Sequence, residues 1–243
     1  MKKIKTSVMA VATALLAVLL SGCDDKSSAA PVTTATSDTA PETAGVQSRF
    51  VTIATGGASG PYNIIATTLA EIYTKDLKTN SKTQTTGASV ENINLLNQKK
   101  VEMAFLMSDV LSDAINGIGN FPAKIETVSE VAALYPNYVQ IVTSKRSGIS
   151  TITDLKGRRV ATGAQNSGVE VNARNLLEGF GISYNDISVD YLGYAEAADA
   201  LKSGKIDAAF LTSGLPNSSL MALQQGFDLQ LVRVPAEGIA EIA

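Results

Sequence analysis

The chain repeats one pattern twice, and this repeat constrains its fold more than any other feature. A β-branched run at 50–54 leads into Ala-Thr-Gly, a loop, Ser-Gly and a helical pattern. The same order follows the apolar run at 158–161, displaced by 107 residues at Ala-Thr-Gly and by 108 at Ser-Gly. Strand, loop and helix in this order are typical of an α/β fold, and their repetition favours a duplicated lobe.

A second pair of segments repeats more closely. A helical pattern at 90–97 precedes Lys-Val-Glu-Met-Ala-Phe-Leu-Met-Ser, and one at 195–202 precedes Lys-Ile-Asp-Ala-Ala-Phe-Leu-Thr-Ser. These two copies are displaced by a constant 105 residues. Because strand–loop–helix units are common, chance similarity is the alternative, but two features that recur in the same order favour duplication.

The repeat predicts the limits of two lobes. We expect lobe one at 50–135, with 233–243 returning to it, and lobe two at 136–232, with a hinge near 135–138. In lobe one, the spacing of Ile65, Leu69 and Ile72 predicts the buried face of the helix that follows the first strand.

The amino-terminal part has the pattern of an export signal. Three lysines precede an apolar run of 13 residues at 8–20, which is too short for a comfortable membrane span. The run ends in Leu-Ser-Gly-Cys, which resembles the lipobox of bacterial lipoproteins, with an ordinary signal peptide as the alternative. We therefore expect a signal peptide at 1–22, then a lipidated Cys23 and a disordered tether over 23–49. The lipid would anchor a periplasmic or other extracytoplasmic protein to its membrane.

Composition excludes several classes of function. The chain has no His, one Cys and a net charge of −3. No Ser-His-Asp or Cys-His pair and no His-ligated zinc can form, and a nucleic-acid binder would need a surplus of Lys and Arg. We expect no enzymatic activity, no cofactor, no metal and no nucleic-acid partner. An enzyme would have to work with carboxylates, Lys or Ser alone.

Both lobes offer the same binding device. A Gly-containing loop after a strand places backbone N–H groups at a helix N-terminus, which attracts anions. Ser59 and Ser167 would cap these helices, while Ser108 and Ser213 end apolar strands at the edge where open α/β sheets bind ligands. The expected ligand-binding residues are Gly57, Ser59, Gly60, Tyr62, Ser89, Asn92, Ser108, Asp109, Asn166, Ser167, Gly168, Ser213 and Gly214.

Two assignments stay open at this stage. Asp109 would repel an anion unless the ligand also carried an ammonium group, and a helix N-cap is the other interpretation. Tyr191 and Tyr194 fit either core packing or a cleft wall.

Several segments, taken together, resemble the solute-binding subunit of TRAP transporters of the TAXI type. The resembling stretches are 53–62, 87–92, 105–109, 133–136, 147–149, 154–160, 166–168 and 204–210. The resemblance implies a hinged, two-lobed fold like that of type II periplasmic binding proteins, which closes on a solute. It also implies an incomplete lobe one, with the C-terminal part apparently truncated, because proteins of this type continue beyond the point where this chain stops.

The resemblance also implies a function. A monomeric binding protein would capture glutamate, another amino acid or a related carboxylate and deliver it to an ion-gradient-driven TRAP permease. The alternative is a ligand sensor that presents the same two-lobed body to a membrane receptor kinase.

Lipidation gives the first testable prediction. Cys23→Ser should release the protein from the membrane fraction or leave its signal peptide uncleaved, because the modified cysteine would be both the processing site and the anchor. Fractionation and intact mass measure both effects. An unchanged mass and an unchanged membrane fraction would contradict the anchor.

Overall fold

The computed structural model describes residues 50–239, which belong to one compact unit. The predicted signal peptide at 1–22, Cys23 with the tether to residue 49, and residues 240–243 lie outside the described part. Within 50–239, no helix has the length and apolar character that a membrane span requires.

The first group of elements alternates strands with helices. It consists of β1 (Phe50–Ala54), α1 (Pro61–Asp76), β2 (Asn80–Gln84), α2 (Ser89–Asn97), β3 (Met103–Ala104) and α3 (Ser108–Asn116). The second group does the same and adds two short 3₁₀ helices, η1 and η2. It consists of β4 (Tyr138–Ser144), η1 (Ile152–Leu155), β5 (Arg159–Ala161), α4 (Gly168–Gly179), η2 (Tyr184–Asp186), β6 (Ser188–Asp190), α5 (Tyr194–Lys202), β7 (Ala208–Ser213), α6 (Ser218–Gln224), β8 (Leu229–Leu231) and α7 (Ala236–Ile239).

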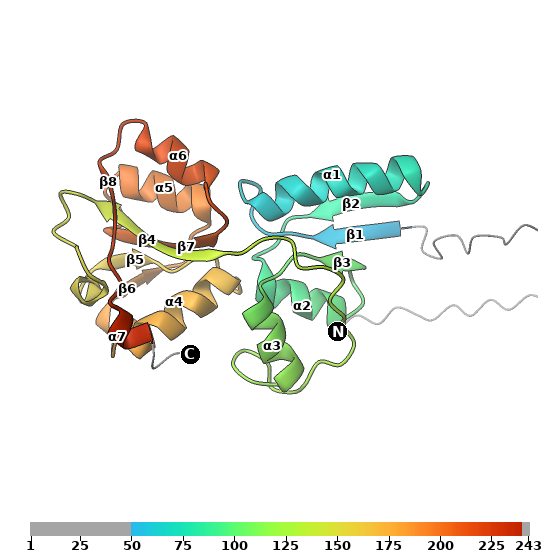
Figure 1. The fold of residues 1–243 in the computed structure, drawn as a ribbon, viewed down its shortest axis with the longest axis horizontal. Helices are drawn as coiled ribbons and strands as arrows, with labels where there is room; N and C mark the ends of the chain where they lie inside the picture. Colours follow the sequence, from blue (N-terminus) through green and yellow to red (C-terminus); the bar gives the residue numbers. More distant parts are fainter. Residues whose placement is uncertain (1–49, 240–243) are drawn as a thin grey trace, which may run out of the picture. The chain divides into compact units, whose positions relative to one another are not determined.

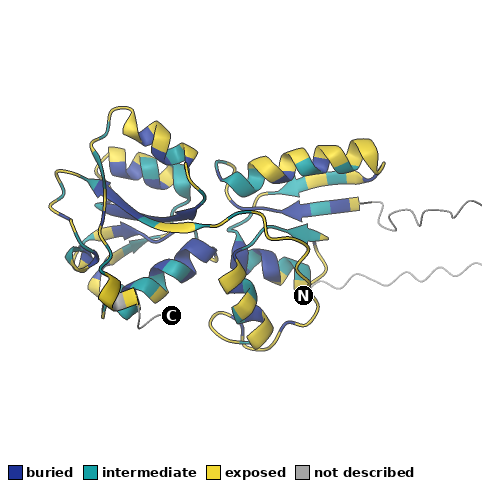
Figure 2. Cartoon of the chain, viewed as in Figure 1, coloured by how far each residue is buried: buried dark blue, intermediate teal, exposed yellow. Residues whose placement is uncertain are grey.

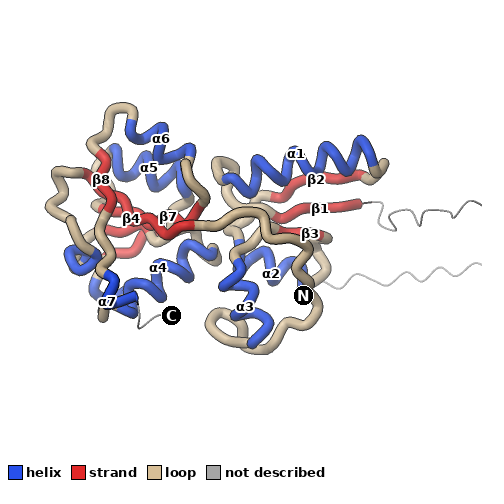
Figure 3. Tube along the Cα trace, in the orientation of Figure 1, coloured by secondary structure: helices blue, strands red, loops and turns tan. Residues whose placement is uncertain are grey.

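The described strands form two sheets (Figures 1 and 3). The first has the order β2-β1-β3 and is parallel throughout. The second has the order β6-β5-β7-β4-β8, in which β4 runs antiparallel to both of its neighbours. The order β2-β1-β3 matches β6-β5-β7, as the sequence repeat predicts, and the predicted α/β fold class is confirmed. The expected lobe limit at 135–136 falls in the segment between the two sheets.

Strand β7 shows why the second sheet is buried on both faces. All six of its residues are buried, and they alternate between two apolar clusters. Ala208 and Phe210 pack with residues of α4, whereas Ala209 and Leu211 pack with residues of α5 and α6. Because side chains alternate across a strand, this continuous apolar run supplies both faces of a covered sheet.

Helix α1 differs from its predicted orientation. Its buried residues are Ala66 and Ala70, while Ile65 is 37% exposed and Ile72 46% exposed. Figure 2 shows the exposed outer face of the helix. The two alanines, one turn apart, pack with Val51 and Ile53 of β1. The small side chains therefore make the contact with the sheet, and the large apolar ones lie outside it.

The last described segment also differs from expectation. Residues 233–239 were expected to return to lobe one. Instead, the Val232 amide donates to the Ile141 carbonyl and the Arg233 amide to the Ser150 carbonyl, so the chain after β8 stays with the second sheet. Helix α7 lies beside α4 (Figure 1).

A buried amide holds the strand ends of the first sheet together. Asn92, in α2, donates to the carbonyls of Thr55 and Phe105, both at 2.6 Å, and accepts from the Thr86 hydroxyl at 2.6 Å. These partners follow β1, β3 and β2 respectively. One side chain thus fixes the loops at the carboxyl edge of the whole sheet.

Asn92→Ala should therefore destabilise the protein strongly. We expect a loss of about 2–4 kcal/mol in the free energy of unfolding, because two buried carbonyls lose their donor. Asn94→Ala, at an exposed position on the same helix, should change it by no more than about 0.5 kcal/mol. Urea unfolding measures both. Equal effects in the two variants would show that the amide does not hold the loops.

Candidate functional site: a cavity at the helix N-termini

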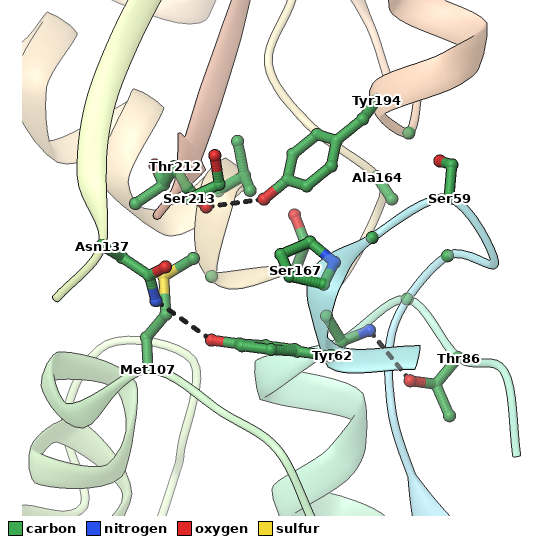
Figure 4. Close-up of a pocket in the computed structure, with 18 of the residues that line it drawn as sticks. Ser59, Tyr62, Thr86, Met107, Asn137, Ala164, Ser167, Tyr194, Thr212 and Ser213 are labelled. Carbon is green, nitrogen blue, oxygen red and sulfur yellow. Dashed lines mark hydrogen bonds between the residues drawn. The ribbon is translucent and has the colours of Figure 1, made fainter. Parts of the chain in front are cut away.

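A cavity of about 340 Å³ lies at the carboxyl edges of strands from both sheets. Its walls come from the β1–α1, β2–α2, β5–α4 and β6–α5 loops, the end of β7 and the segment that precedes β4. Figure 4 shows part of this lining. The volume is at the lower end of the range of small-molecule sites, about 300–1,000 Å³.

Seven predicted site residues line this cavity together. They are Gly57, Ser59, Gly60, Tyr62, Ser167, Gly168 and Ser213. They come from the two Ser-Gly loops and from the end of β7. The repeat in the sequence thus identified loops that the fold brings to one place.

Four helix N-termini reach the cavity. The N-cap residues of α1, α2, α4 and α5 are Gly60, Ala88, Ser167 and Gly193, and all four line it. The unpaired N–H groups of a first turn carry a partial positive charge. Helices α2, α4 and α5 each have an acid in the first turn, but α1 has none and no side-chain cap. The N-terminus of α1 is therefore the least neutralised of the four.

The two predicted capping serines differ. The Ser167 hydroxyl accepts from the Glu170 amide at 3.0 Å and caps α4 as expected. Ser59 does not cap α1, because the N-cap is Gly60. Gly168 has a packing reason: a Cβ there would lie 2.7 Å from Met107 Sδ and 2.9 Å from Ser89 Oγ. Glycine lets the N-terminus of α4 approach these residues of the first group.

Tyrosines form much of the wall. The Tyr62 hydroxyl accepts from Asn137 Nδ2 at 3.2 Å, and the Tyr194 hydroxyl donates to the Thr212 carbonyl at 2.6 Å (Figure 4). Tyr135 packs near Tyr62, with ring centroids 6.4 Å apart. Burial raises the pKa of Tyr135 to about 12 and raises the pKa of Tyr62 and of Tyr194 as well. All three are therefore neutral phenols near pH 7.

Three of the other predicted residues have structural partners instead of lining the cavity. Ser89 Oγ accepts from the Met107 amide at 3.1 Å, and Asn92 makes the bonds described above. The Asn166 carbonyl accepts from the amides of Val90 and Glu91 at the start of α2. Asn166 also has a φ of 62°, a left-handed conformation that Asn tolerates better than most residues. These polar groups are satisfied within the protein.

Ser108, Asp109 and Gly214 also lie outside the lining. Ser108 and Asp109 line a second, larger groove of about 1,190 Å³ beside β3. Asp109 accepts from the Val110 amide at the start of α3 and from Asn172 of α4, which favours the structural interpretation of this residue. At Gly214, the site of an added Cβ lies 3.1 Å from the Tyr135 ring.

Sequence reasoning missed half of the wall. The missed or undecided lining residues include Thr86, Gly87, Ala88, Met107, Tyr135, Asn137, Ala164, Tyr191, Tyr194, Glu196 and Thr212. The β2–α2 and β6–α5 loops occupy equivalent places in the two repeats, and that equivalence was the available signal. For Tyr191 and Tyr194, the structure favours the cleft wall over the core.

The described wall contains a single charged residue. Glu196, in the first turn of α5, lines the cavity, and no Lys or Arg of the described chain does. Residues 50–239 also hold no cluster of three or more Asp, Glu, His or Cys that could bind a metal ion. Any charge on a ligand would thus meet helix N-termini, hydroxyls and one carboxylate.

The different roles of the two serines predict different stabilities. Ser167→Ala should lower the free energy of unfolding by about 1 kcal/mol, because α4 loses its cap. Ser59→Ala should change it by no more than about 0.5 kcal/mol, since this residue caps no helix. Chemical denaturation of the ligand-free protein measures both. A loss at Ser59 as large as that at Ser167 would contradict this assignment.

Solved structures of binding proteins share this fold. A protein from Bordetella bronchiseptica RB50 matches with a TM-score of 0.55 and 21% identity, over 76% of this chain and 56% of that one. The alkanesulfonate-binding protein SsuA from Xanthomonas axonopodis pv. citri, bound to MOPS, matches at 0.51 and 19%, over 77% and 61%. An arginine-bound variant of the arginine-binding protein from T. maritima matches at 0.51 and 16%, over 79% and 91%.

This chain therefore spans less than two thirds of the length of the Bordetella and Xanthomonas proteins. The fold that they share is that of type II periplasmic binding proteins, which are not enzymes, in agreement with the sequence prediction. The family model of the NMT1-like family matches residues 53–243, which is most of the chain. The chain accordingly belongs to the NMT1-like family, with the fold of a type II periplasmic binding protein.

Proposed function

We propose that this protein is an extracytoplasmic solute-binding protein that captures a small organic anion or amino acid and delivers it to an ion-gradient-driven TRAP permease. The observation that carries the proposal is the cavity where the N-terminus of α1, without a cap or a first-turn acid, meets loops of both sheets. Such an N-terminus is a ready site for a carboxylate or sulfonate.

Contacts between the two groups of elements support binding by closure. The Asn166 carbonyl accepts from the amides of Val90 and Glu91 at 3.1 and 3.3 Å. Asn172 donates to Asp109, and Asn137 donates to Tyr62. These bonds surround the cavity and would break when it opens. A solute that contacts both walls would therefore favour the closed arrangement.

The finer assignment rests on the sequence. The segments that resemble TAXI-type subunits include the β1–α1 loop and the Asn-Ser-Gly that precedes α4, both in the cavity wall. The Leu-Ser-Gly-Cys motif and the tether suit a protein held at the outer face of a membrane. Sulfonate and arginine, the ligand classes of the similar solved structures, belong in the first screen.

A ligand screen tests the proposal. Thermal shift with carboxylates, sulfonates and amino acids should identify compounds that raise the melting temperature, because a ligand that binds only the native state stabilises it. For the best compound, calorimetry on Ser59→Ala should show a loss of about ten- to a hundredfold in affinity, as expected for one hydrogen bond to a charged group.

The matched control is Ser218→Ala, at an exposed serine in the first turn of α6. It should bind like the wild type. If no compound of these classes binds, the proposed function is wrong. If a compound binds but Ser59→Ala has unchanged affinity, the solute lies elsewhere.

A further inference from the structure

The charges around the cavity are arranged asymmetrically. The N-terminus of α1 offers partial positive charge with no acid in its first turn. The only charged side chain in the described wall is the carboxylate of Glu196, on α5. Its Oε2 lies close to the Cα of Gly193, the N-cap of the same helix. One part of the wall thus suits an anion, and another suits a cation.

The aromatic side chains suit the same cation. Tyr62, Tyr135, Tyr191 and Tyr194 all line the cavity. Tyrosine rings attract an ammonium group through their negative faces, and this attraction is stronger where water is excluded. A ligand with two negative charges would find no Lys or Arg in the described wall and would face Glu196 instead.

Two buried hydroxyls in the wall have no partner among the described residues. Thr212 Oγ1 belongs to a residue that is only 4% exposed, and the Tyr135 hydroxyl is also buried. Both residues line the cavity as well as the neighbouring groove beside β3. A buried hydroxyl without a hydrogen bond is costly, so such groups mark places where a bound molecule supplies the missing partner.

We propose that the solute is a zwitterion with no net charge: its carboxylate binds at the N-terminus of α1 and Ser59, and its ammonium group lies against the tyrosines and Glu196. An uncharged polar group of the solute meets the hydroxyls of Thr212 and Tyr135. This inference rests on the proposed function and narrows its ligand from organic anions in general to amino acids with uncharged polar side chains.

The first test compares ligands of one length. Glutamine, glutamate, glutaramate and glutarate have the same carbon chain and differ in their charges, and the other uncharged amino acids extend the series. The zwitterions should bind most tightly and the dicarboxylate most weakly. Tighter binding of glutarate or of the ammonium-free glutaramate would overturn the inference while leaving the proposed function intact. Binding of no compound would instead remove the proposed function itself.

The second test removes the charge that the ammonium group would meet. Glu196→Gln should weaken the best zwitterion about three- to tenfold, a modest loss because the residue is exposed. It should not weaken the same compound without its ammonium group. Glu178→Gln, at an exposed acid near the end of α4, changes the net charge equally and should bind both ligands like the wild type. Equal effects of Glu196→Gln on both ligands would overturn the assignment.

The third test separates binding from structure. Thr212→Val keeps the shape of the side chain and should weaken the zwitterion about tenfold. It should not lower the melting temperature of the free protein, because the hydroxyl has no partner there. Thr143→Val should do the reverse, since Thr143 bonds to Ser147 and to the Asp207 carbonyl. Wild-type affinity in Thr212→Val would show that this hydroxyl does not meet the solute.

Discussion

Parallel strand pairing is the constraint on which the cavity depends. Strand β1 pairs in parallel with β2 and β3, and β5 pairs in parallel with β6 and β7. A helix that follows a parallel strand begins at the strand's carboxyl edge, so all helices of one sheet begin at the same edge. The N-termini of α1, α2, α4 and α5 therefore gather around one space. The positive character of this space comes from the backbone and needs no Lys or Arg.

The sequence predicted the architecture well because periodicity and repetition report on backbone geometry. Strand β7 was recognisable from its uninterrupted apolar run, and the repeat gave the equivalence of β1 with β5. Helix α1 was harder, since hydrophobicity alone favoured Ile65 and Ile72 over Ala66 and Ala70. What decided its orientation was close packing on a sheet, and a pattern of apolar residues does not encode the distance between helix and sheet.

The site was predicted in part for a related reason. A polar residue at a loop can face a ligand or satisfy the backbone, and the two look alike in sequence. Asn92 and Ser89 belong to the second kind, as their buried bonds to Thr55, Phe105 and Met107 show. Tyr135 and Thr212 could not be singled out, because their place in the wall depends on a segment and a strand that carry no loop motif. Such residues are found from unpaired hydroxyls, which only a structure reveals.

The largest apolar cluster contains residues of both repeats. Val90, Ile93 and Val110 from the first group belong to the same buried cluster as Val160 and Phe210 from the second. Residues 50–239 therefore have a shared interior, and the two repeats are not independent foldons. Opening the cavity would expose part of that interior to water. The cooperativity of unfolding and the lifetime of a bound solute would then be governed by the same apolar surface, so substitutions that loosen the core should also shorten residence time.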